Sequence, residues 1–284
     1  MNVSMKVPED CARCLYDQQA ARTKDGAYLA RVREILESRR PEDSAPYMVY
    51  LFGREFERRF GVSRRFAGDK RRYNELVLSM EADLRRRIEA APDPLKEALV
   101  CARLGNYIDF GAMESVDPDA FLRLFDGASM SGADEATYAL FLDRCAKGRR
   151  FLLLCDNCGE IVLDRMMLEQ LHRRFPHLEL TALVRGGEAL NDATVEDARF
   201  AGMDRVARVI GNGEAIAGTV YGMLSDEARR AVDEADVILS KGQGNYESFA
   251  GSGREAFYAF LCKCDLFVRR YGVPRFAGMF LMEK

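Results

Sequence analysis

The feature that most constrains the fold is a short apolar run that ends abruptly in two polar side chains. Phe151–Cys155 is continuously apolar, as expected for a strand buried on both faces of a parallel sheet. Asp156 and Asn157 follow directly, and residues 161–175 continue with helical spacing. In an open α/β sheet, ligands bind at this edge. A carboxylate beside an amide carbonyl there favours a hard divalent cation such as Mg²⁺ or Mn²⁺.

Strand-like and helix-like segments alternate through residues 149–284. Alternation of this kind is typical of βαβ units, so we expect a three-layer α/β domain with a mainly parallel sheet. The expected strands are Phe151–Cys155, Leu178–Val184, Arg205–Ile210, Val237–Ser240 and part of Ala256–Cys262, and the expected helices are Val162–Phe175, Val195–Gly202 and Ser225–Glu234.

The first half of the chain has a different pattern. Apolar residues recur at three- and four-residue spacing from residue 8 to about 147, which predicts a mainly helical domain over 1–148. We expect the basic residues between Arg54 and Arg72 to form a solvated helical face. The expected helices include Asp25–Arg39, a single helix over Tyr73–Ala91 ended by Pro92, Pro118–Asp126 and Ala133–Gly148.

Charge and composition restrict the kind of partner. Lys and Arg number 42 against 45 Asp and Glu, a formal net charge of −3, so no overall field favours nucleic acid or an anionic membrane. We expect a small-molecule partner. The sequence has no apolar segment long enough to span a membrane and no signal-peptide core, which favours the cytoplasm. The 8 cysteines fit a reducing compartment, and the oligomeric state stays open.

Polar residues also follow two other expected strands. Asn191 and Asp192 come after a glycine turn behind the second strand. Lys241 follows the fourth strand, and Gly242 and Gly244 after it allow a ligand to approach the backbone closely. Because the carboxyl ends of parallel strands share one edge of a sheet, these residues are expected to meet Asp156 and Asn157 in one site.

A cluster of this composition suits phosphoryl transfer. Three protein oxygens could hold one octahedral ion, and a lysine adds positive charge where a phosphoryl group would bind. The expected catalytic residues are Asp156, Asn157, Asp192 and Lys241, the first three being the expected metal ligands. A water on the metal, or one held by Glu160 or Asp197, could be the nucleophile.

Each of these residues also has a purely structural interpretation. Asp156 and Asn157 could cap the following helix, Asp192 could be an Asx-turn residue, and Lys241 a surface cation. Other chemistries find no support, because the chain lacks a Gly-x-Ser-x-Gly elbow, a phosphate-binding Gly-Lys-Ser/Thr loop and a complete dinucleotide fingerprint. Its 2 histidines, His172 and His177, lie in or just after an expected helix.

Four cysteines near the ends of the chain suggest a second metal. Cys11 and Cys14 form one C-x-x-C pair, and Cys262 and Cys264 lie near the other terminus. If the termini met, four thiolates could hold a structural zinc ion. Free thiols are the commoner outcome.

Three motifs follow the expected strands: Asp156-Asn-Cys-Gly-Glu160, Gly186-Gly-Glu-Ala-Leu-Asn-Asp-Ala-Thr-Val-Glu-Asp197 and Lys241-Gly-Gln-Gly-Asn-Tyr-Glu247. They resemble signatures of the damage-control phosphatases, the family first catalogued as domain of unknown function 89. The N-terminal C-x-x-C pair and the segment Gly105–Asp109 resemble its stand-alone prokaryotic branch.

The resemblance implies helices packed on a Rossmann-like α/β portion, with a deep site between them. It implies hydrolysis of phosphorylated metabolites, including sugar phosphates, with Mn²⁺, Co²⁺, Ni²⁺ or Mg²⁺. By carry-over, Asp156, Asn157 and Asp192 would bind the metal and Lys241 would face the phosphate. Residues implied on the substrate side are Asn106, Asp109, Glu160 and Asn245.

Two positions depart from the family pattern. Glu188 stands where many relatives have proline, and Cys158 fills a slot usually held by a small residue. Two competing functions stay open: a carboxyl methyltransferase, which some eukaryotic relatives have been called, and a metal- or metabolite-binding protein without catalysis.

Overall fold

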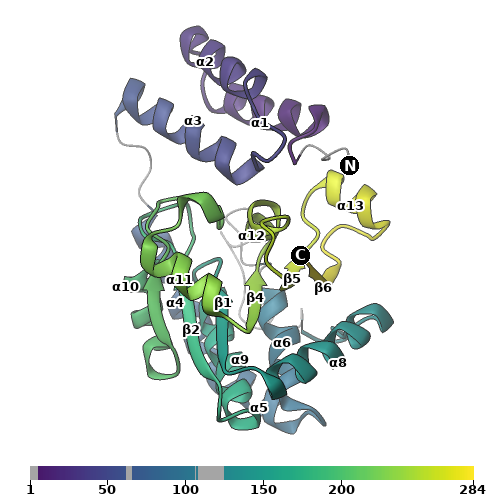
Figure 1. The fold of residues 1–284 in the computed structure, drawn as a ribbon. Coiled ribbons are helices and arrows are strands. Elements are labelled where there is room, and N and C mark those ends of the chain that lie inside the picture. The colour runs from purple at the N-terminus through teal and green to yellow at the C-terminus, as the bar shows by residue number, and fades with distance from the viewer. Residues whose placement is uncertain (1–5, 62–65, 106, 108–124) are drawn as a thin grey trace.

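The protein is described by a computed structural model that covers residues 6–61, 66–105, 107 and 125–284 (Figure 1). Its centre is a six-stranded sheet in the order β3-β2-β1-β4-β5-β6. This is the order of a doubly wound Rossmann sheet, and the direction of winding reverses between β1 and β4. The strands are β1 Arg150–Leu154, β2 Glu179–Val184, β3 Arg208–Gly211, β4 Val237–Lys241, β5 Ala256–Leu261 and β6 Gly278–Glu283. The first five are parallel and β6 is antiparallel to β5.

Helices surround the sheet, and several have recognisable start signals. Ser131 and Asp134 form a capping box at the start of α8, as Thr194 and Asp197 do for α10. The helices before the sheet are α1 Glu9–Arg22, α2 Gly26–Glu37, α3 Ala45–Phe60, α4 Ala67–Ser79, α5 Glu81–Ala90, α6 Pro94–Gly105 and α8 Gly132–Lys147. Those that follow are α9 Glu160–Arg174, α10 Val195–Phe200, α11 Asp226–Glu234, α12 Gln243–Phe249 and α13 Asp265–Tyr271.

The sheet is buried on both faces, which makes the α/β part three-layered. Phe151 and Leu153 face a core formed with α4, α5, α6, α8 and α9. Leu152 and Leu154 point the other way, into a core that includes residues of α11, α12 and α13. Burial on both faces explains why β1 is apolar at successive positions. The expected mixed α/β fold is confirmed.

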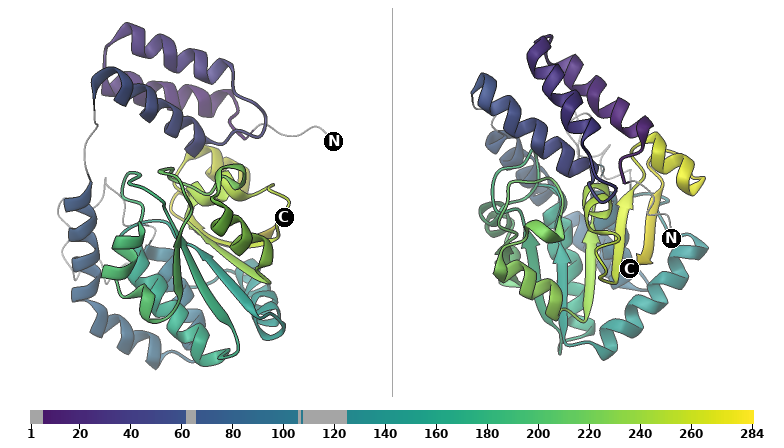
Figure 2. Two further views of the ribbon diagram at one scale, coloured as in Figure 1. Left: turned by 60° about the vertical axis from the view of Figure 1, so that its left-hand side comes forward. Right: turned by 45° about the horizontal axis from the view of Figure 1, so that its top comes forward.

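Helices α1, α2 and α3 form a cap over the carboxyl end of the strands (Figure 2). Their own apolar core includes Tyr28, Val32, Met48 and Phe52. By contrast, α4, α5, α6 and α8 share one core with the sheet, so the buried clusters do not separate at residue 148. The division into domains 1–148 and 149–284 stays a prediction.

Several predicted elements need correction. The single helix expected over Tyr73–Ala91 is two helices, because Met80 leaves helical geometry between α4 and α5. The expected strand Arg205–Ile210 starts later, since residues 203–205 form a 3₁₀ turn. The glycine turn expected after Lys241 begins helix α12 at Gln243, and α13 and β6 were not predicted. Most of Pro118–Asp126 lies outside the described residues.

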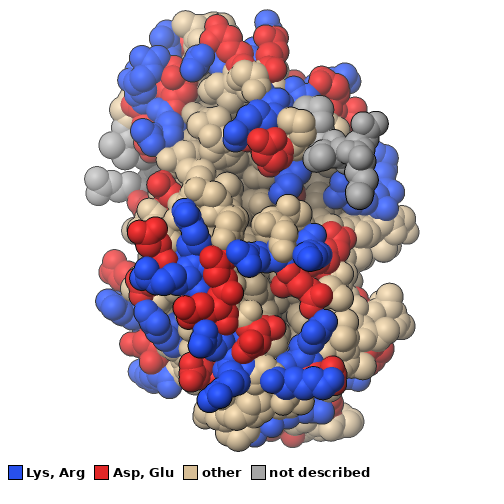
Figure 3. Space-filling view, in the orientation of Figure 1, with Lys and Arg blue, Asp and Glu red and all other residues tan. Residues whose placement is uncertain are grey.

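The described surface carries both signs of charge. Figure 3 shows Lys and Arg interspersed with Asp and Glu on this face, which is hollowed between the cap and the body below it. Within the described part of the chain, no helix is long and apolar enough to cross a bilayer.

Candidate active site

Two loops at the carboxyl edge of the sheet are joined by backbone hydrogen bonds. The Ala193 amide donates to the Asp156 carbonyl at 2.8 Å, and the Cys158 amide donates to the Asn191 carbonyl at 2.9 Å. Asn157 and Asp192 form an isolated antiparallel bridge. The loops after β1 and β2 therefore bring Asp156, Asn157 and Asp192 together, as their positions after neighbouring strands predicted.

Arg185 lies between the two carboxylates. Its Nε donates to Asp192 Oδ2 at 2.6 Å and its Nη2 to Asp156 Oδ1 at 3.3 Å. The side chain is 1% exposed, and Nη1 donates to Asn245 and Thr219. Sequence reasoning missed this residue. The sequence feature that could have indicated it is an arginine placed directly after a buried strand and before two glycines. Arginine stays charged when it is buried.

Asn245 joins the ends of two strands. Its Nδ2 donates to the Cys155 carbonyl at 2.9 Å and to the Lys241 carbonyl at 2.7 Å. Its Oδ1 accepts hydrogen bonds from Arg185 and Thr219. The amide thus holds Arg185 at the strand ends, and its expected contact with substrate stays a prediction.

Lys241 is fully buried and has three protein acceptors. Its Nζ donates to Glu160 Oε1 at 2.6 Å, to Asp164 Oδ1 at 2.8 Å and to the Ala102 carbonyl at 2.8 Å. An ammonium group has three N–H donors, so all are used. Burial opposes its charge, but Asp164 and Glu160 outweigh burial and raise the pKa of Lys241. The expected contact between Lys241 and phosphate stays a prediction.

The Glu160 carboxylate connects Lys241 with Asn157. Its Oε2 accepts from Asn157 Nδ2 at 3.2 Å, and that Nδ2 also donates to Asp156 Oδ2 at 2.7 Å. The amide nitrogen therefore faces carboxylates, and Oδ1 is the atom of Asn157 that could bind a cation. Burial raises the pKa of the neighbouring Asp164 to about 7, against the opposing charge of Lys241.

The paired acids are strongly perturbed. Burial, with the charges of Asp192 and Glu160, raises the pKa of Asp156 well above its ordinary value despite Arg185. Burial also raises the pKa of Asp192, although Arg185 lowers it. Acidic groups outnumber the cations that pair with them here. Asp156, Glu160, Asp164 and Asp192 are buried in this cluster, and the buried cations in ion pairs with them, among the described residues, are Arg185 and Lys241.

The donor set fits a hard divalent ion in chemistry. Asp156 and Asp192 offer carboxylate oxygens and Asn157 an amide oxygen, the ligands that Mg²⁺ and Mn²⁺ prefer. In the described residues, no three His, Cys, Asp or Glu side chains are grouped so that they could hold a metal ion. The expected set has an amide as its third member, and its metal binding stays a prediction.

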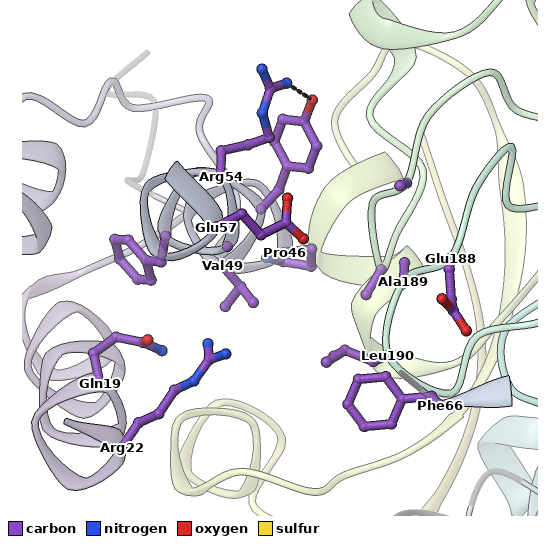
Figure 4. A pocket seen from close by; sticks show the side chains of 15 residues that line it. Gln19, Arg22, Pro46, Val49, Arg54, Glu57, Phe66, Glu188, Ala189 and Leu190 are labelled. Atoms are coloured by element: carbon purple, nitrogen blue, oxygen red, sulfur yellow. Dashed lines mark hydrogen bonds between the residues drawn. The ribbon is translucent and has the colours of Figure 1, made fainter. Parts of the chain in front are cut away.

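Two cavities flank the loop after β2. One, of about 470 Å³, lies between the cap and residues 188–190, with Arg22 of α1, Val49 of α3 and Leu190 among its walls (Figure 4). The other, of about 460 Å³, is lined by Arg185, by the following glycines and by Lys70 of α4. The second cavity therefore borders a residue that contacts both Asp156 and Asp192.

Other expected site residues have different outcomes. Asn106 and Asp109 lie outside the described residues. The Asp197 carboxylate caps α10 and pairs with Lys70, whose Nζ lies 2.6 Å from Asp197 Oδ2. Lys70 is 3% exposed, so the expectation of a solvated basic face is wrong for this residue.

The two ends of the chain meet, as the zinc hypothesis required. Asp10 of α1 pairs with Arg269 of α13 at 3.0 Å, and the charge of Cys264 contributes to the raised pKa of Cys11, for which burial is the main cause. All four cysteines near the termini are free thiols, and Cys14 is exposed. A structural zinc ion at Cys11 and Cys14 stays a prediction.

Fold and site together define a class of protein. It is a doubly wound α/β protein with a helical cap, and it has a carboxylate-rich cluster at the topological switch point of its sheet.

Comparisons with known proteins identify the family. The family described as "Damage-control phosphatase ARMT1-like domain" matches residues 6–278. A damage-control phosphatase from Archaeoglobus fulgidus is 32% identical over 215 residues, covering 75% of this chain and 74% of that protein. Another, from Pyrococcus horikoshii, is 26% identical and aligns over 99% of both chains. The crystal structure of a DUF89 family protein from Pyrococcus horikoshii has a TM-score of 0.80 at 25% identity, covering 98% of this chain and 99% of that one.

The chain belongs to the damage-control phosphatase ARMT1-like family. The resemblance seen in its motifs is confirmed.

Proposed function

We propose that this protein is a metal-dependent phosphatase that hydrolyses small phosphorylated metabolites. The observation that carries the proposal is the cluster of buried acidic groups at the carboxyl edge of the sheet. Ionised carboxylates are costly to bury, and a divalent cation would stabilise their charged form. Relatives named damage-control phosphatase support the reaction type.

Asp156, Asn157 and Asp192 would hold the ion, which could be Mn²⁺, Co²⁺, Ni²⁺ or Mg²⁺. When bound, such an ion polarises phosphoryl oxygens and acidifies a water molecule. Arg185 orients both carboxylates through its fixed guanidinium geometry. Glu160, held by Lys241, orients the Asn157 amide. These contacts keep the ligand oxygens in place before substrate arrives.

The cavity beneath the cap would receive the organic part of the substrate, to which the phosphoryl group is attached. Figure 4 shows Arg22 and Gln19 of α1 on one side of this cavity and Leu190 and Phe66 on the other. Leu190 has a positive φ of 49° and is 44% exposed, although it lies two positions before Asp192. A mixed polar and apolar lining suits a small organic phosphate. The resemblance to the family implies that Asn106 and Asp109 of this chain also contact the substrate.

The test is phosphate release from p-nitrophenyl phosphate and from a panel of phosphorylated metabolites, with each metal and with EDTA. We expect activity that EDTA removes and a divalent metal restores. Asp156→Ala and Asp192→Ala should each lower turnover by at least ~10²–10³-fold. Metal binding without hydrolysis of any substrate would instead favour a binding protein.

The loop after β1 does not favour the methyltransferase. A site for S-adenosylmethionine would need a glycine-rich loop after the first strand, and the loop after β1 has Gly159, which begins α9 with a φ of 82°. Methyl transfer to a carboxylate, measured in parallel, would separate the two activities.

A further inference from the structure

We propose that the cavity bordered by Lys70 and Arg185 binds the phosphoryl group, and that Lys70 is the residue whose ammonium contacts the phosphoryl oxygens. The inference deepens the proposed function and rests on it. The cavity has a volume of about 460 Å³ and lies beside the loop that leads to Asp192.

The position of Lys70 follows from how α4 packs. Asn74 lies one turn after Lys70 on the same helical face. Its Oδ1 accepts from the Gly159 amide at 2.6 Å, directly beside the loop that carries Asp156 and Asn157. Both Lys70 and Asn74 are buried. Helix α4 is therefore attached to the candidate metal loop, and Lys70 is held on the side that faces the site.

Lys70 has more spare hydrogen-bond donors than the other two buried cations of the site. Lys241 uses all three N–H groups on protein acceptors. The Arg185 guanidinium uses four of its five N–H groups, on Asp156, Asp192, Thr219 and Asn245. Among the described residues, Lys70 has one ion-pair partner, Asp197, which leaves two ammonium hydrogens for a ligand.

The surroundings of Lys70 also suit a phosphoryl group. The cavity wall includes Gly186, Gly187 and the hydroxyl-bearing Thr194. Glu188, Glu196 and Asp197 are acidic residues of the same wall. Asp197 is already engaged, because it accepts from the Thr194 amide at 2.9 Å and from the Thr194 hydroxyl at 2.6 Å.

The competing explanation is that Lys70 only ties α4 to α10 through Asp197. Two variants separate these roles. Lys70→Met keeps the apolar stem and removes the charge, whereas Asp197→Asn removes the ion pair and leaves the ammonium in place. If Lys70 only ties the helices together, both variants should be less stable than the wild type and should bind phosphate with unchanged affinity. A phosphate ligand requires that Lys70→Met alone weaken phosphate binding.

The experiment measures the Kd of inorganic phosphate by calorimetry in the presence of Mn²⁺, together with kcat and KM for p-nitrophenyl phosphate. We expect Lys70→Met to weaken phosphate binding by at least tenfold and to raise KM, with Lys70→Arg recovering part of the affinity. Mn²⁺ binding should stay within a factor of two or three. Arg86→Met, an exposed position on α5, is the control and should match the wild type.

Failure of the inference and failure of the proposed function look different. If the wild type hydrolyses phosphomonoesters while Lys70→Met binds phosphate as tightly as the wild type, Lys70 is not a phosphate ligand. If the wild type hydrolyses none, the phosphatase proposal fails, and the phosphate Kd still tests Lys70. Equal losses of phosphate affinity in Lys70→Met and Asp197→Asn would also overturn the inference, because the ion pair would then be the required feature.

Discussion

Gly242 shows how a missing side chain shapes the candidate site. Its φ is 82°, and a Cβ at this position would lie 1.9 Å from Asp156 Oδ2. A side chain here would therefore displace the carboxylate that we propose as a metal ligand. The glycine allows the backbone after Lys241 to pass beside Asp156, which explains at the atomic level why the motif needs glycine.

We expect Gly242→Ala to reduce metal affinity and turnover at least tenfold, and to lower the free energy of unfolding by roughly 2 kcal/mol or more. The matched control is Gly253→Ala. Gly253 has a similar φ of 84°, but a Cβ added there would meet no atom within 4 Å beyond its chain neighbours. The Gly253→Ala variant should lose about 1 kcal/mol of its free energy of unfolding and keep its metal affinity. Chemical denaturation and Mn²⁺ titration measure both effects, and equal behaviour of the two variants would contradict the proposed clash.

Glu247 provides a pH-dependent test at the same scale. Burial raises the pKa of its carboxyl to about 7, although a hydrogen bond from Gln243 and the charges of Arg270 and Lys6 oppose this. Between the unfolded value near 4.5 and about 7, the folded state keeps a proton that the unfolded state has released. The folded state therefore loses stability as the pH rises through this range.

Glu247→Gln should consequently be more stable than the wild type at pH 8, by on the order of 1–3 kcal/mol, with the difference vanishing below about pH 4.5. Urea denaturation across this pH range measures the effect. Glu37→Gln, at an exposed position, serves as the control. Its free energy of unfolding should differ little from that of the wild type at every pH. A constant difference for Glu247→Gln would mean that its ionisation is not coupled to folding.

At the scale of elements, the cap and the loop after β2 form the two walls of one cavity. Tyr50 of α3 donates from its hydroxyl to Glu214 Oε2 at 3.3 Å, so α3 contacts the loop after β3. Val49, the adjacent residue, lines the cavity opposite Leu190. If the proposed function holds, helix α3 would select among substrates without contacting the proposed metal ligands.

We expect Val49→Phe to fill part of this cavity and to lower kcat/KM for large phosphorylated metabolites by roughly 5- to 100-fold, the effect of about 1–3 kcal/mol of overpacking. Acetyl phosphate, which is too small to reach the cap, should be hydrolysed within twofold of the wild-type rate. Arg58→Gln, an exposed substitution on the same helix, is the control. Equal losses for large and small substrates would show that the cavity does not hold the substrate.

At the scale of the whole molecule, metal binding should be visible as stability. A ligand that binds the folded state alone stabilises it by about 2.7 kcal/mol at a concentration one hundred times its Kd. For a chain of this size, that corresponds to an increase in Tm of roughly 5 °C. Mn²⁺ added to EDTA-treated protein should produce this increase, and Asp192→Asn should reduce it to about 1–2 °C. An undiminished increase in the variant would place the ion elsewhere.

Several features of the fold and site could be predicted from the sequence because they are local. Phe151–Cys155 is apolar at every position because β1 is buried on both faces, and this pattern predicted a parallel sheet. Asp156 and Asp192 follow neighbouring strands, so their convergence required no knowledge of the loops. The joint at Met80 was missed because both helices on either side of it have the same apolar spacing.

The partners of the buried cations depended on tertiary structure. Lys241 Nζ contacts Glu160 and the Ala102 carbonyl, which lie 81 and 139 positions away in the chain. Lys70 belongs to a basic segment that reads as a solvated face, yet it lies in the cavity beside Arg185. Local pattern determined which residues reach the edge of the sheet. The choice of cation for each carboxylate was decided by packing between distant helices, because an ion pair depends on separation in space and burial, which sequence spacing does not encode.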